Sequence, residues 1–425
     1  MRYKESEFNL MFLDETGKHI YYNTFSGALV RLNQPIYQYI VEDQSDSDEY
    51  KKLISLGFLI PEKQDEINKF VIERKKAEFG TVKKLSRFVV APTLACQAKC
   101  IYCFQAGINR NSSHMSGETA DEVIHYITDE IIKMNTPKVI VTFFGGEPLL
   151  QIERIIQIGQ SLKIWCAQHE IEFHSELITN GILLDKELAL KLKQCVNLYF
   201  AQITLDGRRE AYATIKGIDK YDKVVNNIKN ICDFLKIIIR VNVTRSNVEE
   251  IKELLKELLI SEKLDGKLKV TLARVQDYFG CDFNESDCLT PSEFAQFRAE
   301  VYLDSTYRYQ SLLKRDLLPE IRRCYCGMEN CMTSTIGPEG ELYKCEHYFG
   351  VNDQIIGTVQ EGRYYNEAEL SFYGELDPKC ISSRCPILPT CVGGCQSERV
   401  QFGVPKDCEN RIDEFIQNLK TYIKL

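Results

Sequence analysis

Short apolar runs alternate with amphipathic stretches through the middle of the chain. From Arg87 onward, the apolar runs have the length of strands, and the segments between them have the spacing of helices. Six such units in order predict parallel strands with a right-handed wind, and a closed barrel would need eight. The fold class predicted is therefore α/β, a partial (β/α)6 barrel of the TIM type. The predicted strands are 88–93, 139–144, 171–178, 198–205, 237–244 and 268–273, and the predicted helices are 117–133, 152–168, 186–194, 223–235, 248–261 and 291–303.

The two ends of the chain follow other patterns. Segments 8–13 and 20–23 are short apolar runs around a polar turn, which predicts a hairpin. Two short helices at 36–41 and 50–56, a closing run at 58–61 and a charged helical connector at 69–83 complete a winged-helix-type module. The chain from Cys324 to its last residue has weak periodicity and nine cysteines, which is typical of segments that need metal to fold. The predicted domains are 1–85, 86–315 and 316–425.

Composition narrows the function classes. The net charge is −8, so the basic surface of a nucleic-acid binder is missing. No apolar run is long enough to cross a membrane, and the first residues do not form a signal peptide, so we expect a cytoplasmic protein. Seventeen cysteines in a reducing compartment, most of them clustered, favour metal binding over disulfides.

Three cysteines follow the first predicted barrel strand, and we call Cys96, Cys100 and Cys103 the cysteine triplet. Their spacing is Cys-x3-Cys-x2-Cys. Three thiolates on one loop can bind three corners of a cubane iron–sulfur cluster and leave the fourth iron open for chemistry. For the triplet taken alone, a zinc site or three unrelated cysteines remains the alternative.

The triplet and three later motifs resemble the radical S-adenosylmethionine (SAM) enzymes. The motifs are Gly145-Gly146-Glu147-Pro148, Thr179-Asn180-Gly181 and Thr204-Leu205-Asp206-Gly207, each after a predicted strand. The resemblance implies that the triplet ligates a [4Fe–4S] cluster whose open iron chelates SAM, and that reductive cleavage gives a 5′-deoxyadenosyl radical. Lys216 stands where relatives carry an arginine. The implied cofactor contacts are Tyr102, Gly145, Gly146, Glu147, Thr179, Asn180, Thr204, Lys216 and Arg240.

The C-terminal cysteines resemble the SPASM extension of peptide-modifying radical SAM enzymes. The motif Cys391-Val392-Gly393-Gly394-Cys395 is typical of it, whereas Cys380-x4-Cys385 has a longer gap than usual. A module with two zinc ions remains the alternative. The resemblance implies two auxiliary [4Fe–4S] clusters, one bound by Cys326, Cys331, Cys345 and Cys395 and one by Cys380, Cys385, Cys391 and Cys408, with Cys324 as a substitute ligand.

The N-terminal module resembles the peptide-recognition element of enzymes that mature ribosomally made peptides. Such elements bind a leader segment as an added strand at a sheet edge. Glu346 and His347 follow Cys345, where sulfatase-maturing relatives carry an aspartate, so the resemblance disfavours that role and makes Glu346 a candidate general base.

The implied function is a maturase that abstracts hydrogen from a precursor peptide with a leader sequence and installs thioether cross-links, as in sactipeptides and ranthipeptides. The implied partners are that peptide and an electron donor of the flavodoxin or ferredoxin type, with no nucleic acid and no membrane. Alternatives are a maturase that makes carbon–carbon cross-links or epimerises residues, and an anaerobic sulfatase-maturing enzyme. From a different class, a non-catalytic metal-binding regulator also remains.

Overall fold

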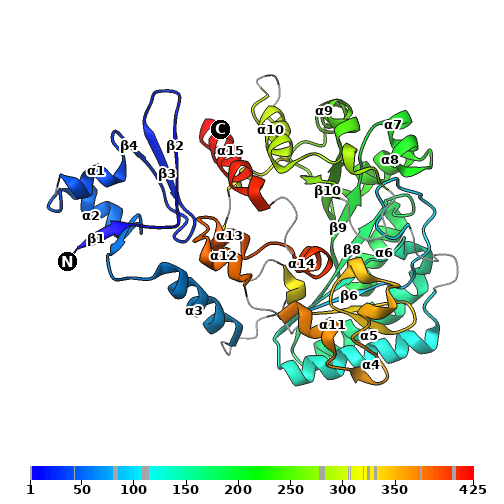
Figure 1. Ribbon diagram of the computed structural model, residues 1–425. Helices are drawn as coiled ribbons and strands as arrows, with labels where there is room; N and C mark the ends of the chain where they lie inside the picture. Colours follow the sequence, from blue (N-terminus) through cyan, green and yellow to red (C-terminus); the bar gives the residue numbers. More distant parts are fainter. Residues whose placement is uncertain are drawn as a thin grey trace. The chain divides into compact units, whose positions relative to one another are not determined.

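The computed structural model divides the chain into two compact units, described one at a time (Figure 1). Unit 1 comprises Met1–Thr81, Lys314–Cys326 and Gly374–Leu425, and unit 2 comprises Val82–Leu313 and Gly327–Tyr373. The described residues are 2–42, 44–79, 85–106, 114–276, 283–304, 306, 308–318, 320–322, 326–329, 333–373, 376–403 and 408–425.

Unit 2 is built on one sheet whose first six strands are parallel. The strand order is β11-β10-β9-β8-β7-β6-β12-β13-β14-β15. Helices pack on β6, β8, β9 and β10 and lie along the outside of the strands in Figure 1. All six strands predicted from the sequence and their parallel pairing are confirmed. The strands are β6 (Ser86–Val90), β7 (Lys138–Phe143), β8 (Glu172–Thr179), β9 (Leu198–Thr204), β10 (Lys236–Val243) and β11 (Lys269–Arg274).

The helices of unit 2 begin and end at residues that the local sequence supplies. Ser116 and Asp185 accept hydrogen bonds from the first turns of α4 and α6, and both helices end at an asparagine in the left-handed conformation. The six predicted helices are present. The helices are α4 (Gly117–Met134), α5 (Ile152–Gln168), α6 (Lys186–Val196), α7 (Arg209–Lys216), α8 (Tyr221–Ile231), α9 (Val248–Leu255) and α10 (Pro291–Tyr302).

Two details of these helices differ from the prediction. The predicted helix 248–261 is α9 followed by a π-helical turn, η3 (Lys256–Ser261). Helix α7 was not predicted, because its eight residues are too few to show a clear helical period. Its residues Tyr212 and Ile215 are buried, and Gly217 ends the helix with a φ of 64°.

A segment from the C-terminal part of the sequence extends the central sheet. Strand β12 pairs in parallel with β6, and three short antiparallel strands follow it. The compact units therefore place residues 327–373 with the sheet, whereas the predicted boundary at residue 315 separated them. The functional division into three domains stays a prediction. The elements are β12 (Thr333–Ile336), β13 (Glu341–Tyr343), β14 (Gly357–Thr358), β15 (Gly362–Arg363) and α11 (Glu367–Leu370).

Unit 1 joins the first and last segments of the chain. The predicted hairpin is confirmed as β2 and β3, which form an antiparallel sheet with β4, while β1 pairs with β5. The predicted helices near 36–41 and 50–56 are present. The predicted helix 69–83 is present as far as residue 79, where this described segment of the chain ends. The elements are β1 (Tyr3–Glu5), β2 (Asn9–Leu13), β3 (His19–Asn23), β4 (Leu29–Leu32), β5 (Leu59–Pro61), α1 (Ile36–Val41), α2 (Asp48–Ser55), α3 (Glu66–Phe79), α12 (Pro378–Ser382), α13 (Leu388–Cys391), α14 (Gln396–Phe402) and α15 (Arg411–Lys424).

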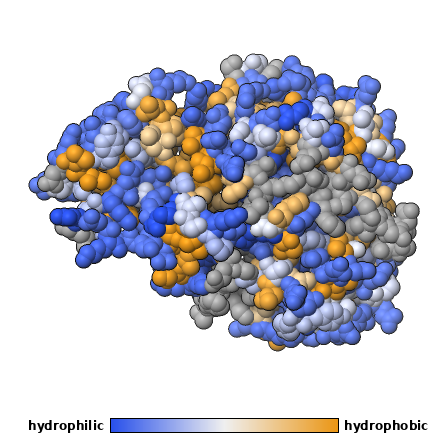
Figure 2. All heavy atoms as spheres, viewed as in Figure 1, coloured by the Kyte–Doolittle hydropathy of each residue, from blue (hydrophilic) through white to orange (hydrophobic). Residues whose placement is uncertain are grey.

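The surface is mainly polar on the face shown in Figure 2, where hydrophobic residues form small separate groups. Among the helices in the described part of the chain, none combines the length and the apolar character that a membrane crossing requires.

Candidate active site

The cysteine triplet lies on the loop that follows β6, and all three thiols are partly exposed. This loop is held by backbone hydrogen bonds to the end of α7. The amides of Lys99 and Ile101 donate to the carbonyls of Lys216 and Ile215 at 2.8 and 3.0 Å. The helix that the sequence analysis missed is therefore one support of the loop that carries the triplet.

The donor set of the triplet fits an iron–sulfur cluster. Thiolates are the usual ligands of such clusters, and the Asn180 side-chain amide lies 3.8 Å from the Cys96 sulfur, within reach for an N–H donor. Burial, with the charges of Glu147 and Cys100, raises the pKa of the Cys96 thiol to about 11. A bound cluster would supply the positive charge that favours the thiolate. Among the described residues, no three His, Cys, Asp or Glu side chains form a site for one metal ion, and cluster ligation stays a prediction.

Gly145 and Gly146 pack closely against the backbone that leads into the triplet. A Cβ atom on Gly146 would lie 2.2 Å from the carbonyl oxygen of Ala95, and one on Gly145 would lie 2.4 Å from that of Thr93. Gly145 also has a φ of 123°, which an L-residue rarely adopts. In the structure, the two glycines allow the backbone of another segment of the same chain to come close. The predicted contact of these glycines with a cofactor stays a prediction.

The Glu147 carboxylate is fully buried and joins the ends of β7 and β8. One oxygen accepts hydrogen bonds from the Leu149 amide and the Thr179 hydroxyl at 3.1 and 2.7 Å, and the other accepts from the Asn180 amide at 2.9 Å. Burial outweighs these bonds and raises the pKa of Glu147 to about 7. The structure thus brings the predicted residues Glu147, Thr179 and Asn180 together through direct hydrogen bonds.

The pKa of Glu147 predicts how the stability of the cofactor-free protein depends on pH. The unfolded chain releases this proton near 4.5 and the folded protein near 7, so the folded state holds more protons between these values. Stability should therefore fall as pH rises through this window, by up to about 3 kcal/mol from this group. Glu147→Gln should flatten this slope in chemical unfolding measured across the window. An equal slope in both proteins would contradict the assignment.

Lys216 and Tyr102, both predicted as cofactor contacts, contact each other and Asp206. The Lys216 ammonium lies 2.6 Å from the Asp206 carboxylate and donates to the Tyr102 hydroxyl at 2.7 Å, while that hydroxyl donates to Asp206. The side chains of Lys216 and Asp206 are 2% and 0% exposed. Burial lowers the pKa of Lys216, but the charge of Asp206 outweighs it and raises that pKa well above its usual range. We call these three residues the buried triad, in which Lys216 and Asp206 are buried and Tyr102 is partly exposed.

Asp206 also supports the neighbouring strand, because its second oxygen accepts from the Asn242 amide at 2.6 Å. Asp206 belongs to a motif predicted from the sequence, but no role was predicted for its side chain. The motif was the available signal, since a carboxylate directly after a buried strand needs partners.

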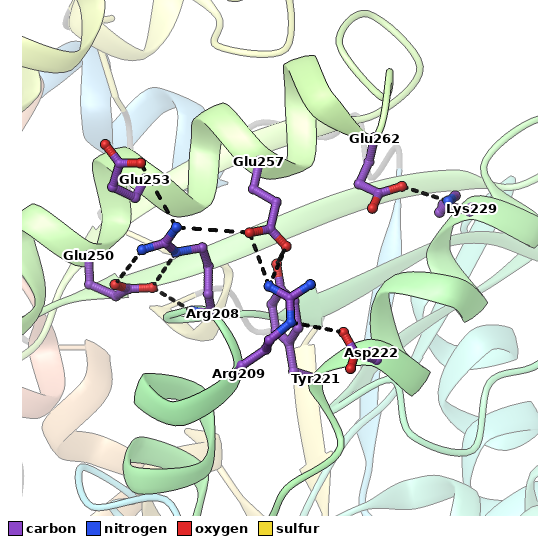
Figure 3. A network of polar contacts seen from close by, with 9 residues as sticks. All are labelled: Arg208, Arg209, Tyr221, Asp222, Lys229, Glu250, Glu253, Glu257 and Glu262. Atoms are coloured by element: carbon purple, nitrogen blue, oxygen red, sulfur yellow. Dashed lines mark hydrogen bonds and ion pairs between the residues drawn. The ribbon is translucent and has the colours of Figure 1, made fainter.

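A surface network holds α7 against α9 and η3 (Figure 3). Arg208 donates from its backbone and its guanidinium to Glu250 at 2.8 Å. Arg209 donates to Glu257 at 2.9 Å, and the Tyr221 hydroxyl donates to the same carboxylate at 3.2 Å. Each exposed pair contributes little to stability. Together they fix the start of the helix whose other end carries Lys216.

The remaining barrel candidates lie on β9, on β10 and after β13. Thr204 ends β9 and is the register partner of Arg240, whose Nε donates to the Asn242 side-chain oxygen at 3.0 Å. The His347 ring lies 4.7 Å from the ring of Phe104, the residue after the triplet. The structure thereby brings the segment after Cys345 close to the triplet loop, which the sequence could not show.

The electrostatics of this segment follow from its burial. Burial lowers the pKa of His347, the charge of Glu346 opposes this, and the charge of Arg240 adds to it. The Glu346 carboxylate lies 4.0 Å from the Cys345 sulfur. Glu346 thus stands beside a predicted cluster ligand, and its role as a base stays a prediction.

A cavity of about 550 Å³ opens beside the triplet loop. Arg245, directly after β10, donates to Glu293 at 2.8 Å and to the Ser286 carbonyl at 3.2 Å, which holds one wall in place. No residue of this cavity was predicted from the sequence, because its walls come from segments far apart in the chain. The lining residues are Ile101, Arg245, Phe283, Asn284, Ser286 and Asp287.

The predicted auxiliary ligands have two different outcomes. Cys380, Cys385, Cys391 and Cys408 all belong to unit 1, and we call them the C-terminal thiol set. Burial, followed by the charges of Cys391 and Cys408, raises the pKa of the Cys380 thiol to about 12. For the other predicted cluster, Cys326 and Cys395 belong to unit 1 and Cys345 to unit 2, while Cys331 and the substitute Cys324 lie outside the described residues.

Residues 90–258 match the family model described as "Radical SAM superfamily". These residues form a radical SAM domain. Such a domain carries one [4Fe–4S] cluster and SAM, whose reductive cleavage starts its chemistry. The matched range includes the triplet, the Glu147 turn and the buried triad.

Three relatives have different activities. The chain is 27% identical over 176 residues to Fe-coproporphyrin III synthase of Methanosarcina barkeri, and this match covers 40% of each protein. It is 29% identical over 317 residues to a probable GTP 3′,8-cyclase of Saccharolobus islandicus, which covers 69% of this chain and 93% of the relative. It is 23% identical over 396 residues to the radical SAM cyclopropyl synthase TigE of Paramaledivibacter caminithermalis, covering 84% and 77%.

Two solved structures show a similar fold. The chain resembles anSMEcpe with bound AdoMet at a TM-score of 0.59 and 19% identity, over 80% of this chain and 96% of that one. It resembles Streptococcus suis SuiB bound to SAM at a TM-score of 0.56 and 18% identity, over 95% and 97%. At these identities the likeness shows the fold alone.

Proposed function

We propose that this protein is a radical SAM maturase that acts on a ribosomally made precursor peptide and joins a cysteine sulfur to a peptide carbon. The observation that carries the proposal is the combination of parts in the chain. Unit 2 contains a radical SAM domain, and unit 1 contains a module of strands and helices joined to a cysteine-rich segment. In the sheet β2-β3-β4, the edge strands β2 and β4 each pair with one neighbour. Such an edge is the kind of surface to which a leader peptide adds as a strand.

Solved structures of similar fold support a peptide substrate. SuiB has been solved bound to precursor peptide SuiA, with a TM-score of 0.52 over 95% of this chain. The anSMEcpe protein has been solved with AdoMet and the Cp18Cys peptide, with a TM-score of 0.57 over 80%. The SuiB likeness extends over nearly the whole chain, including the N-terminal module.

The proposed reaction removes two hydrogens from the peptide for each cross-link. When bound, the cluster and SAM supply a 5′-deoxyadenosyl radical, which takes one hydrogen atom from a peptide carbon. The cysteine thiol loses its proton, its sulfur bonds to that carbon, and the surplus electron passes to an oxidised iron–sulfur cluster. Glu346 is the candidate acceptor of the thiol proton in this scheme. The two auxiliary clusters and the electron donor of the flavodoxin or ferredoxin type belong to the same proposal.

A carbon–carbon bond is the second candidate product. The relative TigE, which aligns over 84% of this chain, is named as a cyclopropyl synthase, and that name denotes closure of a ring of three carbons. Closure of such a ring also removes two hydrogens. Mass alone does not separate the two products, but the state of the cysteine does.

We predict the following result for co-expression with a short cysteine-containing peptide encoded beside this chain. Mass spectrometry should find the peptide lighter by two hydrogen atoms for each cross-link, and each cross-link should protect one cysteine from alkylation. The same loss with every cysteine still alkylated would indicate a carbon–carbon bond instead. An unchanged mass would contradict both products, and co-expression with Cys100→Ala is the negative control.

A further inference from the structure

The C-terminal thiol set is built into the same compact unit as the N-terminal module. Unit 1 contains Met1–Thr81 and Gly374–Leu425, which stand at opposite ends of the sequence. In Figure 1 the helices α12 and α13 lie beside the strands β2 and β3 of this unit. The contacts between them show what each half contributes.

One face of the β2–β3 hairpin is covered by the C-terminal segment. Leu10, Phe12, Ile20 and Tyr22 are buried in one cluster with apolar residues of the C-terminal helices. Cys385 and Cys391 pack against this cluster, and the Tyr22 and Phe415 rings lie 6.5 Å apart. Two of the four sulfur ligands of the predicted cluster therefore border the core of the hairpin.

A second apolar cluster joins α3 to the same segment. Phe8 and Phe70 are buried with Leu388 and Val392. The rings of Phe8 and Phe70 lie 6.3 Å apart. Cys380 and Cys385 pack against this cluster, so Cys385 borders both.

Polar contacts tie the two ends of the chain together around these clusters. The Thr24 hydroxyl donates to the carbonyl of Pro386 at 2.6 Å. The Arg384 guanidinium donates to both carboxylate oxygens of Glu7, with Nε at 2.6 Å. Both contacts flank Cys385 in sequence, so the turn that carries this thiol is fixed to the module.

The part of the C-terminal segment that carries Cys380, Cys385 and Cys391 has little regular structure of its own, whereas α15, with 14 residues, supplies Phe415 to the interface. Helices α12, α13 and α14 have 5, 4 and 7 residues. Isolated helices of this length are unstable in water, and small loop-rich segments commonly depend on bound metal. The side chain of Arg411 lies 3.8 Å from the Cys391 sulfur, and Arg411 also donates to the buried Glu398 at 3.2 Å. The thiols therefore have the surroundings of a structural site.

We propose that a cluster bound by the C-terminal thiol set is a structural element of the N-terminal module. It orders the segment around Cys380, Cys385 and Cys391, and that segment forms the second wall of the β2–β3 core. If the module recognises a leader peptide, which rests on the proposed function, recognition then depends on this cluster. A redox centre of the C-terminal region would thereby also control substrate docking.

Hydrogen exchange on the reconstituted protein tests this directly. The test variant is Cys380→Ala with Cys408→Ala, and the matched control is Cys100→Ala with Cys103→Ala. Each removes two thiols and should remove about four irons per chain. The test variant should exchange about tenfold faster or more in β2 and β3, with β7 and β8 unchanged, while the control should leave β2 and β3 at the wild-type rate.

Three results would overturn the proposal. They are wild-type exchange in the hairpin after the iron is lost, an equal increase in the control, and full iron content in the test variant. The experiment contains no peptide, so its failure leaves the proposed peptide chemistry untouched, and an unmodified peptide leaves this proposal untouched.

A reciprocal variant keeps the proposal testable if the double variant does not fold. Tyr22→Ala removes the ring against Phe415, and it should speed the release of about four irons per chain to a chelator. Tyr22→Phe keeps the ring and should release iron at the wild-type rate. Equal release rates in all three proteins would count against a shared core.

Discussion

Replacing Cys100 by alanine is expected to abolish the cleavage of SAM. Cys100 is the central residue of the triplet, on a loop whose backbone is fixed to the end of α7. A [4Fe–4S] cluster with one of three protein ligands missing should not present an open iron in a defined position. We expect about four fewer irons per chain and no 5′-deoxyadenosine above background when SAM and dithionite are added to the reconstituted variant.

Two other variants separate this effect from a general loss of structure. Cys195, on the outer helix α6, carries no predicted ligand role, so Cys195→Ala should keep the iron and the cleavage of SAM. Glu346→Gln should also keep cleavage and act only on peptide modification, because Glu346 is a candidate base for the peptide thiol. Full cleavage by Cys100→Ala would show that the triplet does not hold the cluster.

Replacing Lys216 by methionine is expected to destabilise unit 2 strongly. Lys216 and Asp206 form an ion pair at 2.6 Å with side chains 2% and 0% exposed. Removing one partner of a buried pair leaves the other charge without compensation, which typically costs about 3–5 kcal/mol. Chemical unfolding of the cofactor-free protein should therefore show a midpoint far below that of the wild type.

A double variant isolates the charge. Lys216→Met combined with Asp206→Asn removes both charges and should recover much of the loss, whereas Lys216→Met alone should not. Lys216→Arg keeps the charge, but the planar guanidinium must fit a site shaped for an ammonium, so an intermediate loss is expected. If Lys216→Met unfolded at the wild-type midpoint, the ion pair would not be a significant source of stability.

The buried triad also changes how the Lys216 position is understood. The family resemblance assigned this position to the cofactor, whereas the structure directs the ammonium to Asp206 and Tyr102. Through its backbone carbonyl, Lys216 also holds the loop between Cys96 and Cys100. The contacts that Lys216 makes with Asp206, Tyr102 and the triplet loop are those of a positioning residue. A contact of Lys216 with the bound cofactor stays a prediction.

Local patterns in the sequence determined the frame of unit 2. Alternating strand-length and helix-length segments located the six parallel strands, because apolar periodicity reflects which face of each element is buried. The motifs containing Glu147, Thr179 and Asn180 were identified by their resemblance to a known family, and their place at the ends of these strands supported the identification. Parallel strands end at one edge of a sheet, so residues placed there meet. The spacing of the triplet was also visible in the sequence, because its three cysteines lie within eight residues.

Tertiary structure decided what depends on contacts between distant segments. The pairing of β12 with β6, the ring contact between Phe104 and His347, and the hydrogen bond from Lys216 to Tyr102 each join residues more than a hundred positions apart. The grouping of the N-terminal module with the C-terminal thiol set spans almost the whole chain. Periodicity and motif spacing describe only neighbours along the chain, whereas these contacts follow from which apolar faces cover one another. The sequence alone therefore determined the radical-generating motif, and only the folded chain decided what surrounds it.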